Sequence, residues 1–227
     1  MRGLIDALRR ERVLPRAELA GLIREISDGD MPYLFDAARE TARSRFGNRI
    51  YTRGLIEFTN YCRCDCYYCG IRRSNRQAER YRLTQEEILA CCRAGYALGF
   101  RTFVLQGGED PYFTDERICR IVSAVKSSWP DCAVTLSIGE KEHSSYRLYR
   151  KAGADRYLLR HETASPAHYR RLHPPEQTPQ RRRQCLWSLK ELGYQVGAGF
   201  MVGSPYQTPE NLADDLLFLH ELSPQMA

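Results

Sequence analysis

The feature that most constrains this chain is a short cysteine-rich stretch in which Cys62, Cys66 and Cys69 stand in the spacing Cys-x3-Cys-x2-Cys. Three thiolates can hold three irons of a [4Fe–4S] cluster and leave the fourth iron open to a substrate or cofactor. The motif directly follows a strand-like run, Leu55–Asn60. It is therefore expected on a loop at the C-terminal end of a strand, where barrel enzymes keep their active sites.

Two other roles for the cysteines fit the sequence less well. A structural zinc site needs four protein ligands and usually has paired Cys-x2-Cys knuckles. No second knuckle is present, because the remaining cysteines outside the loop are scattered over helix-like and strand-like segments: Cys91, Cys92, Cys119, Cys132 and Cys185. Cys64 lies inside the loop, but Cys-x-Cys spacing does not suit the three-iron geometry. We therefore expect Cys64 to be a spare thiol.

Composition agrees with an intracellular redox enzyme. The 227 residues include nine cysteines, and the N-terminus is charged where a signal peptide needs an apolar core. We expect a cytoplasmic protein with free thiols. No apolar run approaches the roughly 20 residues that span a bilayer, so no membrane association is expected. The net charge of +6 includes basic clusters at 80–82 and 181–183. Acids are interspersed and no nucleic-acid module accompanies them, so no nucleic-acid partner is expected.

Helical patterns precede the cysteine motif. The clearest are Arg16–Ser27 and Met31–Phe46, and Gly47 is a plausible stop for the second. We therefore expect a helical cap over residues 1–50, ahead of a main domain over residues 51–227.

Strand-like and helix-like runs alternate after the cap. The expected strands are Leu55–Asn60, Thr102–Gln106, Ala133–Ile138, Arg156–Leu159 and Gln195–Val202. The expected helices are Thr84–Leu98, Thr114–Ser127, His143–Ala152, about Gln180–Leu192 and Pro209–Leu222. Strict alternation predicts right-handed βαβ units around a parallel sheet, and therefore an α/β fold.

Two glycines and an acid follow the second strand, at Gly107, Gly108 and Glu109. Glycine lets the backbone approach a ligand closely. A carboxylate at this edge can accept hydrogen bonds from an ammonium group. A glycine turn beside a solvated acid is the plain alternative. Because the run ends the strand next after the cysteine loop, we favour the functional interpretation.

Charged residues mark the end of the fourth strand, at Arg160, His161 and Glu162. A Glu there can accept hydrogen bonds from ribose hydroxyls or an amine, and Arg160 can offer a planar fork to a carboxylate. An internal Arg–Glu ion pair would use the same residues. The fifth strand contains Met201 within 199–203, where a buried barrel strand would look much the same.

These segments resemble the radical S-adenosylmethionine (SAM) superfamily, whose signature is this cysteine spacing with an aromatic, here Tyr68, before the last cysteine. The resemblance implies a partial TIM-type (βα) barrel, of which about five units are present, a [4Fe–4S] cluster, and SAM bound through its amino and carboxylate groups to the open iron. Reductive cleavage would give a 5′-deoxyadenosyl radical. It also implies that Gly107, Gly108 and Glu109 hold the SAM amino group, and that Met201 lies beside adenine.

Within the superfamily, the chain resembles the [FeFe]-hydrogenase maturase family HydE, a relative of biotin synthase. The blocks that carry this resemblance are Ile56–Cys62, Tyr68–Arg73, Arg80–Arg82, Val104–Tyr112, Ala154–Thr163 and Asp214–Leu219. The resemblance implies that Ser137, Glu162 and Arg182 contact SAM and that Arg160 belongs to the substrate cavity. Arginines also stand at 181 and 183, so a neighbouring arginine is the alternative for the carboxylate contact. Tyr206 departs from the family by replacing an expected glycine.

The family resemblance also implies partners. These are a small-molecule or organometallic iron substrate of Fe(CO)2(CN)–cysteine type, hydrogenase maturation proteins, and an electron donor such as ferredoxin or flavodoxin. The chain stops where a further strand is expected, which indicates a C-terminally truncated barrel. The alternatives are a methylornithine synthase or another biotin synthase-like enzyme, and, from a different class, an inactive iron–sulfur-binding fragment or scaffold.

Overall fold

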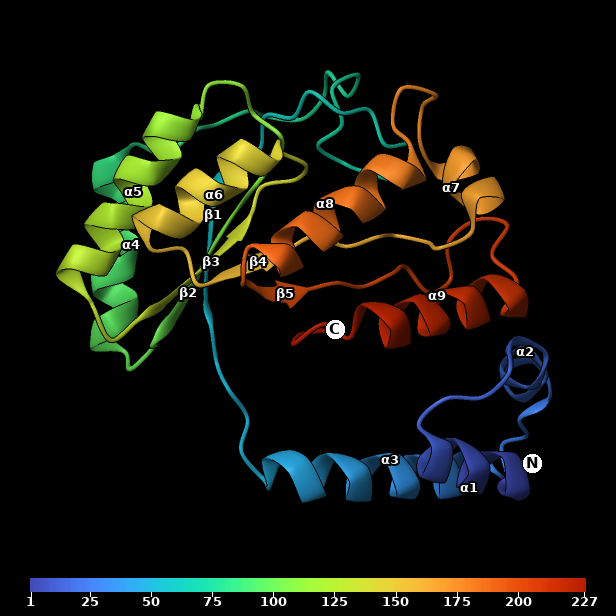
Figure 1. Cartoon of the computed structure of the whole chain (residues 1–227). Coiled ribbons are helices and arrows are strands. Elements are labelled where there is room, and N and C mark those ends of the chain that lie inside the picture. The colour runs from blue at the N-terminus through green and yellow to red at the C-terminus, as the bar shows by residue number, and fades with distance from the viewer. The chain divides into compact units, whose positions relative to one another are not determined.

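Five parallel strands form one sheet in chain order, from β1 to β5 (Figure 1). The structure is a computed structural model that describes residues 1–227. The strands are Gly54–Thr59 (β1), Thr102–Gly107 (β2), Ala133–Ser137 (β3), Arg156–Leu158 (β4) and Gln195–Gly197 (β5). Sequential parallel neighbours require a crossover after each strand, and the expected α/β fold with barrel-like order is confirmed.

Nine helices accompany the sheet. They are Arg2–Glu11 (α1), Arg16–Glu25 (α2), Met31–Phe46 (α3), Gln85–Ala97 (α4), Asp115–Ser128 (α5), His143–Ala152 (α6), Pro166–Leu172 (α7), Pro179–Glu191 (α8) and Pro209–Leu222 (α9). Local sequence sets several of their ends. Thr84 and Thr208 form capping boxes with Glu87 and Asn211, and Gly47 ends α3 with a φ of 64°.

Two expectations about the elements were wrong. The fifth strand ends at Gly197 rather than 202, and Phe200 makes only an isolated bridge with Glu162. The helix α7 was missed because seven residues are too few to establish a helical period. Met201 consequently lies in a loop, not in a strand.

The chain divides into two compact units. The barrel unit comprises residues 52–161, 169–199 and 224–227, and the helical unit comprises residues 1–51, 162–168 and 200–223. In the barrel unit, the strands contribute buried apolar and aromatic side chains such as Leu136, Tyr157 and Val196 to the core. The inner strands carry them in near-continuous runs, as expected for a parallel sheet with a covered face.

The helical unit contains more of the chain than its first 51 residues. Helix α9 packs against α2, and Ala213 of α9 belongs to the same buried cluster as Ile5, Leu19 and Leu22. Arg16 also makes a bidentate pair with Asp214 through contacts of 2.5 and 2.8 Å. The sequence-based boundary between 50 and 51 therefore separates helices that share one core. No helix in the chain has the length and apolar run that a membrane crossing needs.

Candidate active site

The cysteine loop joins the C-terminal end of β1 to α4, as the strand-like run before the motif predicted. The register between β1 and β2 shifts between Glu57 and Thr59, just before the loop begins. Within the loop, the Cys69 N–H donates to the Cys66 carbonyl at 3.0 Å, and the Arg73 N–H donates to the Cys64 carbonyl at 2.9 Å. These turns fold the stretch back on itself, and its four thiols are all half-buried.

The thiols differ in their surroundings. A hydrogen bond from Cys64 lowers the pKa of Cys62 to about 6, and the Glu109 N–H adds a contact of 3.4 Å to its sulfur. The Cys64 thiol correspondingly has a raised pKa. Burial raises the pKa of Cys66, against the opposing effect of the Gln177 amide, which lies 3.4 to 3.5 Å from its Sγ. Cys62 is therefore the thiol most readily deprotonated among these three.

No three Cys, His, Asp or Glu side chains converge to hold a single metal ion. The assignment of Cys62, Cys66 and Cys69 to a cluster therefore rests on their spacing and on their shared loop, not on a preformed cage. Thiolates held on one loop are the donor set that [4Fe–4S] clusters use, so the residues fit that group.

The Gly-Gly-Glu run packs directly against the cysteine loop. A Cβ on Gly108 would lie 2.2 Å from the Tyr61 carbonyl oxygen and 2.7 Å from the Cys62 Cβ. Only glycine allows this approach. The backbone at Gly108 therefore packs closely against the cysteine loop itself. Glu109 is buried, and its carboxylate accepts from Arg63 at 3.0 and 3.1 Å and from the Glu140 N–H at 2.9 Å.

Arg182 is the buried member of the arginine triplet. Its Nε lies 2.8 Å from a Glu140 carboxylate oxygen, but without the alignment of a hydrogen bond. Burial opposes its charge, yet Glu140, Tyr169 and Glu109 together outweigh burial, and the pKa of the Arg182 guanidinium is raised. Arg181 instead bonds to the exposed Glu142 at 2.6 Å. A buried guanidinium with an N–H that lacks an aligned acceptor fits a further anionic group, such as a carboxylate.

Tyr68 is held by a histidine that the sequence did not single out. The Tyr68 hydroxyl lies 3.1 Å from His173 Nε2, and His173 Nδ1 lies 3.0 Å from the Tyr169 carbonyl. His173 is buried and stacks on the Tyr169 ring at 3.8 Å. The Tyr67 N–H also donates to the Leu172 carbonyl at 3.0 Å. The cysteine loop is thereby tied to the C-terminal end of α7.

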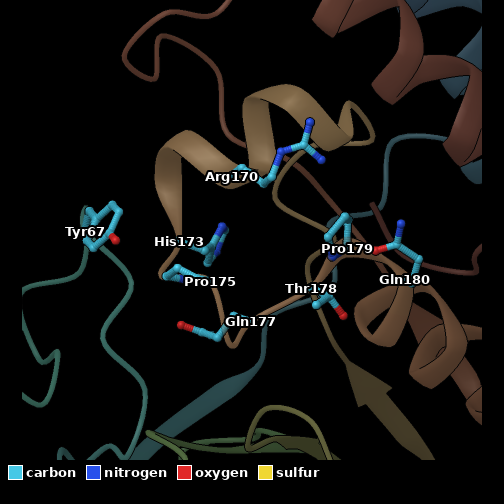
Figure 2. A pocket seen from close by; sticks show the side chains of 8 residues that line it. All are labelled: Tyr67, Arg170, His173, Pro175, Gln177, Thr178, Pro179 and Gln180. Atoms are coloured by element: carbon cyan, nitrogen blue, oxygen red, sulfur yellow. The ribbon is translucent and has the colours of Figure 1, made fainter.

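A pocket of about 340 Å³ lies beside this tie (Figure 2). Figure 2 shows Tyr67 on one side, Arg170 and His173 from α7 and its end, and Gln177 at the foot of the turn. None of the predicted SAM contacts lines it. Gln177, which also contacts the Cys66 sulfur, connects the pocket to the cysteine loop.

The remaining predicted residues are spread over both units. Ser137 ends β3 and is half-buried, and Arg160 follows β4 and is exposed. Glu162 and Met201 belong to the helical unit, where the Met201 N–H donates to the Glu162 carbonyl at 3.1 Å.

Four non-glycine residues of the helical unit have left-handed backbone, and two of them, Arg12 and Ser223, are helix C-caps. The other two, Glu162 and Tyr206, lie outside the helices. Glu162 is buried and has a φ of 66°, and Tyr206 has a φ of 64°. A non-glycine residue in this region costs about 1 to 3 kcal/mol, and such strain gathers at functional sites. The conformation of Tyr206 is one that favours glycine, which agrees with the glycine expected there. Glu162 is therefore a candidate for function on structural grounds as well.

Comparison with known proteins assigns the family. A family model described as "Radical SAM superfamily" matches residues 56–219. The chain belongs to the radical SAM superfamily. Within it, the chain is 50% identical over 188 residues to the "[FeFe] hydrogenase maturase subunit HydE" of Thermotoga maritima, which covers 83% of this chain and 53% of the relative.

Two further relatives carry a different activity in their names. The "3-methylornithine synthase" of Methanosarcina acetivorans is 30% identical over 82% of this chain and 53% of its own length. The crystal structure of methylornithine synthase (PylB) superimposes with a TM-score of 0.88 at 29% identity, over 97% of this chain and 65% of that one. The chain thus spans about half the length of the curated relatives that it matches. The superfamily implies a [4Fe–4S] cluster and SAM.

Proposed function

We propose that this chain forms the radical SAM core of an [FeFe]-hydrogenase maturase of the HydE type. The observation that carries the proposal is 50% identity to HydE over 83% of the chain. The predicted site residues also support it: Cys62 is half-buried, and Glu109 and Arg182 are buried charged residues, as is common at functional sites.

The proposed roles follow from the residues. Cys62, Cys66 and Cys69 would hold the cluster. When bound, the cluster and SAM supply one-electron cleavage of the sulfonium S–C5′ bond. Arg182 would bind the SAM carboxylate through its unaligned Nε proton, and Glu109, buried and fixed by Arg63, would face the amino group.

Further SAM contacts are proposed for Tyr68, Gly107, Gly108, Ser137, Glu162 and Met201. Arg160, the exposed residue after β4, is proposed to contact the substrate. The proposed substrate is a small-molecule or organometallic iron species, and the proposed electron donor is ferredoxin or flavodoxin.

Anaerobic reconstitution tests the chemistry. We expect an EPR signal of a reduced [4Fe–4S] cluster that changes when SAM is added, together with formation of 5′-deoxyadenosine. Cys62→Ala, Cys66→Ala and Cys69→Ala should each abolish the signal, because each removes one cluster ligand. Cys64→Ala is the matched control and should keep it. Loss of the cluster in Cys64→Ala alone would overturn this choice of ligands.

A second candidate function is favoured by the structural likeness to methylornithine synthase, with its TM-score of 0.88. Two assays separate the candidates. One adds the chain to a hydrogenase maturation system that lacks HydE and measures hydrogen evolution. The other supplies lysine and measures methylornithine. Hydrogenase activation without methylornithine supports the maturase, and the reverse result contradicts it.

A further inference from the structure

Arg80 lies where the two ends of the cysteine loop meet, and its guanidinium donates to backbone carbonyls on both sides. Nη1 donates to the carbonyls of Asn60 and Ile71, the latter at 2.9 Å. Nη2 donates to the carbonyls of Arg72 and Asn75, at 2.8 and 3.2 Å. One side chain therefore satisfies four backbone acceptors.

The four carbonyls have a common relation to the cluster ligands. Asn60 precedes Cys62, whereas the other three acceptors follow Cys69. The guanidinium thus joins the entrance of the ligand-bearing segment to its exit. The backbone beside Arg80 is fixed in turn, because Asn60 donates to the Glu79 carbonyl at 2.6 Å and accepts from the Tyr81 N–H at 2.8 Å.

The contacts of Arg80 differ from those of an ordinary surface arginine. Arg80 is half-buried, and it forms no ion pair with a carboxylate. Its planar fork is directed at loop carbonyls, of which only that of Arg72 also accepts a backbone N–H, from Asn75 at 3.1 Å. A lysine would carry the same charge on a single nitrogen and could not reach four separated acceptors with the same geometry. The shape of the guanidinium, more than its charge, is what the loop uses.

We propose that Arg80 is a positioning residue that holds the segment from Cys62 to Cys69 in its ligand-presenting conformation before any cluster is bound. The inference rests on the proposed function insofar as Cys62, Cys66 and Cys69 are the cluster ligands. Preorganised ligands lower the entropy that must be lost when a group binds. Arg80 acts on the cluster through the loop backbone and touches no thiol.

The test compares Arg80→Met and Arg80→Lys with Arg76→Met. Arg76 is exposed in the same loop and donates to none of these carbonyls, so it is the matched control. Hydrogen exchange of the apo protein should show amides of residues 62–75 exchanging at least about tenfold faster in both Arg80 variants. Exchange in the sheet strands should stay unchanged, as should all exchange in Arg76→Met.

Reconstitution supplies the second readout. Both Arg80 variants should take up less iron and sulfide per chain than the wild type, and their residual cluster should have an altered EPR line shape. Ethylguanidinium added to Arg80→Ala should restore uptake, whereas ethylammonium should not, because only the former has the planar fork.

Several results would overturn the inference. These are unchanged loop exchange in Arg80→Met, full cluster assembly in Arg80→Lys, or accelerated exchange throughout the sheet, which would indicate a general structural role. Failure of the wild-type chain to assemble a cluster would contradict the proposed function instead. The apo exchange data would still decide whether Arg80 orders the loop.

Discussion

At the scale of single residues, the candidate site is built from charges that the protein already engages. Glu109 is fixed by Arg63 and by a backbone N–H, and Arg182 faces Glu140. Such contacts hold a side chain in position before a ligand arrives, at the expense of some of its binding capacity. The Nε of Arg182 nonetheless has no aligned acceptor within the protein. A ligand carboxylate could therefore accept a hydrogen bond from Arg182 that no protein group accepts.

Replacing Arg182 by Met should weaken SAM binding by about tenfold to a hundredfold, since a hydrogen bond to a charged group is worth about 1.5 to 3 kcal/mol. Equilibrium dialysis of the reconstituted protein with labelled SAM measures the change. Arg181→Met is the control, because Arg181 bonds to Glu142 and not to Glu140. The SAM affinity of Arg181→Met should equal that of the wild type.

Arg182→Met also leaves the half-buried Glu140 carboxylate without its partner, so stability falls for a separate reason. Adding Glu140→Gln removes that charge and should raise the melting temperature again. SAM affinity should remain weak in the double variant. Recovery of affinity along with stability would mean that Arg182 serves only the fold.

At the scale of elements, a buried carboxylate joins the ends of β1 and β2. Asp110 accepts from Arg82 at 2.7 and 2.9 Å, from the Thr59 hydroxyl at 2.7 Å and from the Tyr112 N–H at 3.0 Å. Arg82 lies 3.8 Å from the centroid of the Tyr61 ring. Asp110 thus links Arg82, in the segment that follows the cysteine loop, to Thr59 at the end of β1.

Asp110 should make the barrel unit sensitive to acid. Burial raises its pKa, but the bonds from Arg82, Thr59 and the Tyr112 N–H together outweigh burial and hold the pKa below its usual range. A depressed folded pKa gives stability that is complete above the unfolded value and is lost as the pH falls through the folded value. Asp110→Asn should lower the free energy of unfolding by about 2 to 3 kcal/mol at neutral pH.

The difference between the wild type and Asp110→Asn should begin to shrink below about pH 4, where the carboxylate of the unfolded chain takes up its proton, and should continue to shrink as the pH falls toward the lower pKa of the folded state. Urea unfolding of the apo protein from pH 7 down to pH 3 measures this difference. A constant gap between the two proteins over that range would contradict the assignment of the charge to Asp110.

At the scale of the whole molecule, the sequence predicts what local chemistry determines and misses what distant contacts determine. The capping boxes at Thr84 and Thr208 are local signals, and the helices that they begin were predicted closely. The link between Cys66 and Gln177 joins residues 111 positions apart, and no spacing rule indicates it. His173 was missed for the same reason.

The same limit explains the helical unit. The sequence predicts α3 from its own period, but the packing of α9 with α2 joins segments from opposite ends of the chain. Ala213 has no exposed surface and lies in the cluster with Leu19 and Leu22. Its small side chain is what lets the two helices approach, and this is visible only once the fold has placed them together.

This packing yields a prediction about residues far apart in the sequence. Ala213→Leu inserts methylenes into a filled core and should destabilise the helical unit by about 1 to 3 kcal/mol. Because α9 shares its core with α1 to α3, hydrogen exchange should accelerate in residues 1–51 as well as in 209–222. Leu216→Ala is the control, since Leu216 is on α9 but 39% exposed, and it should leave exchange in residues 1–51 unchanged. If Ala213→Leu accelerated exchange in α9 alone, the first three helices would form an independent cap, and the boundary near residue 50 expected from the sequence would describe the molecule better than the shared core.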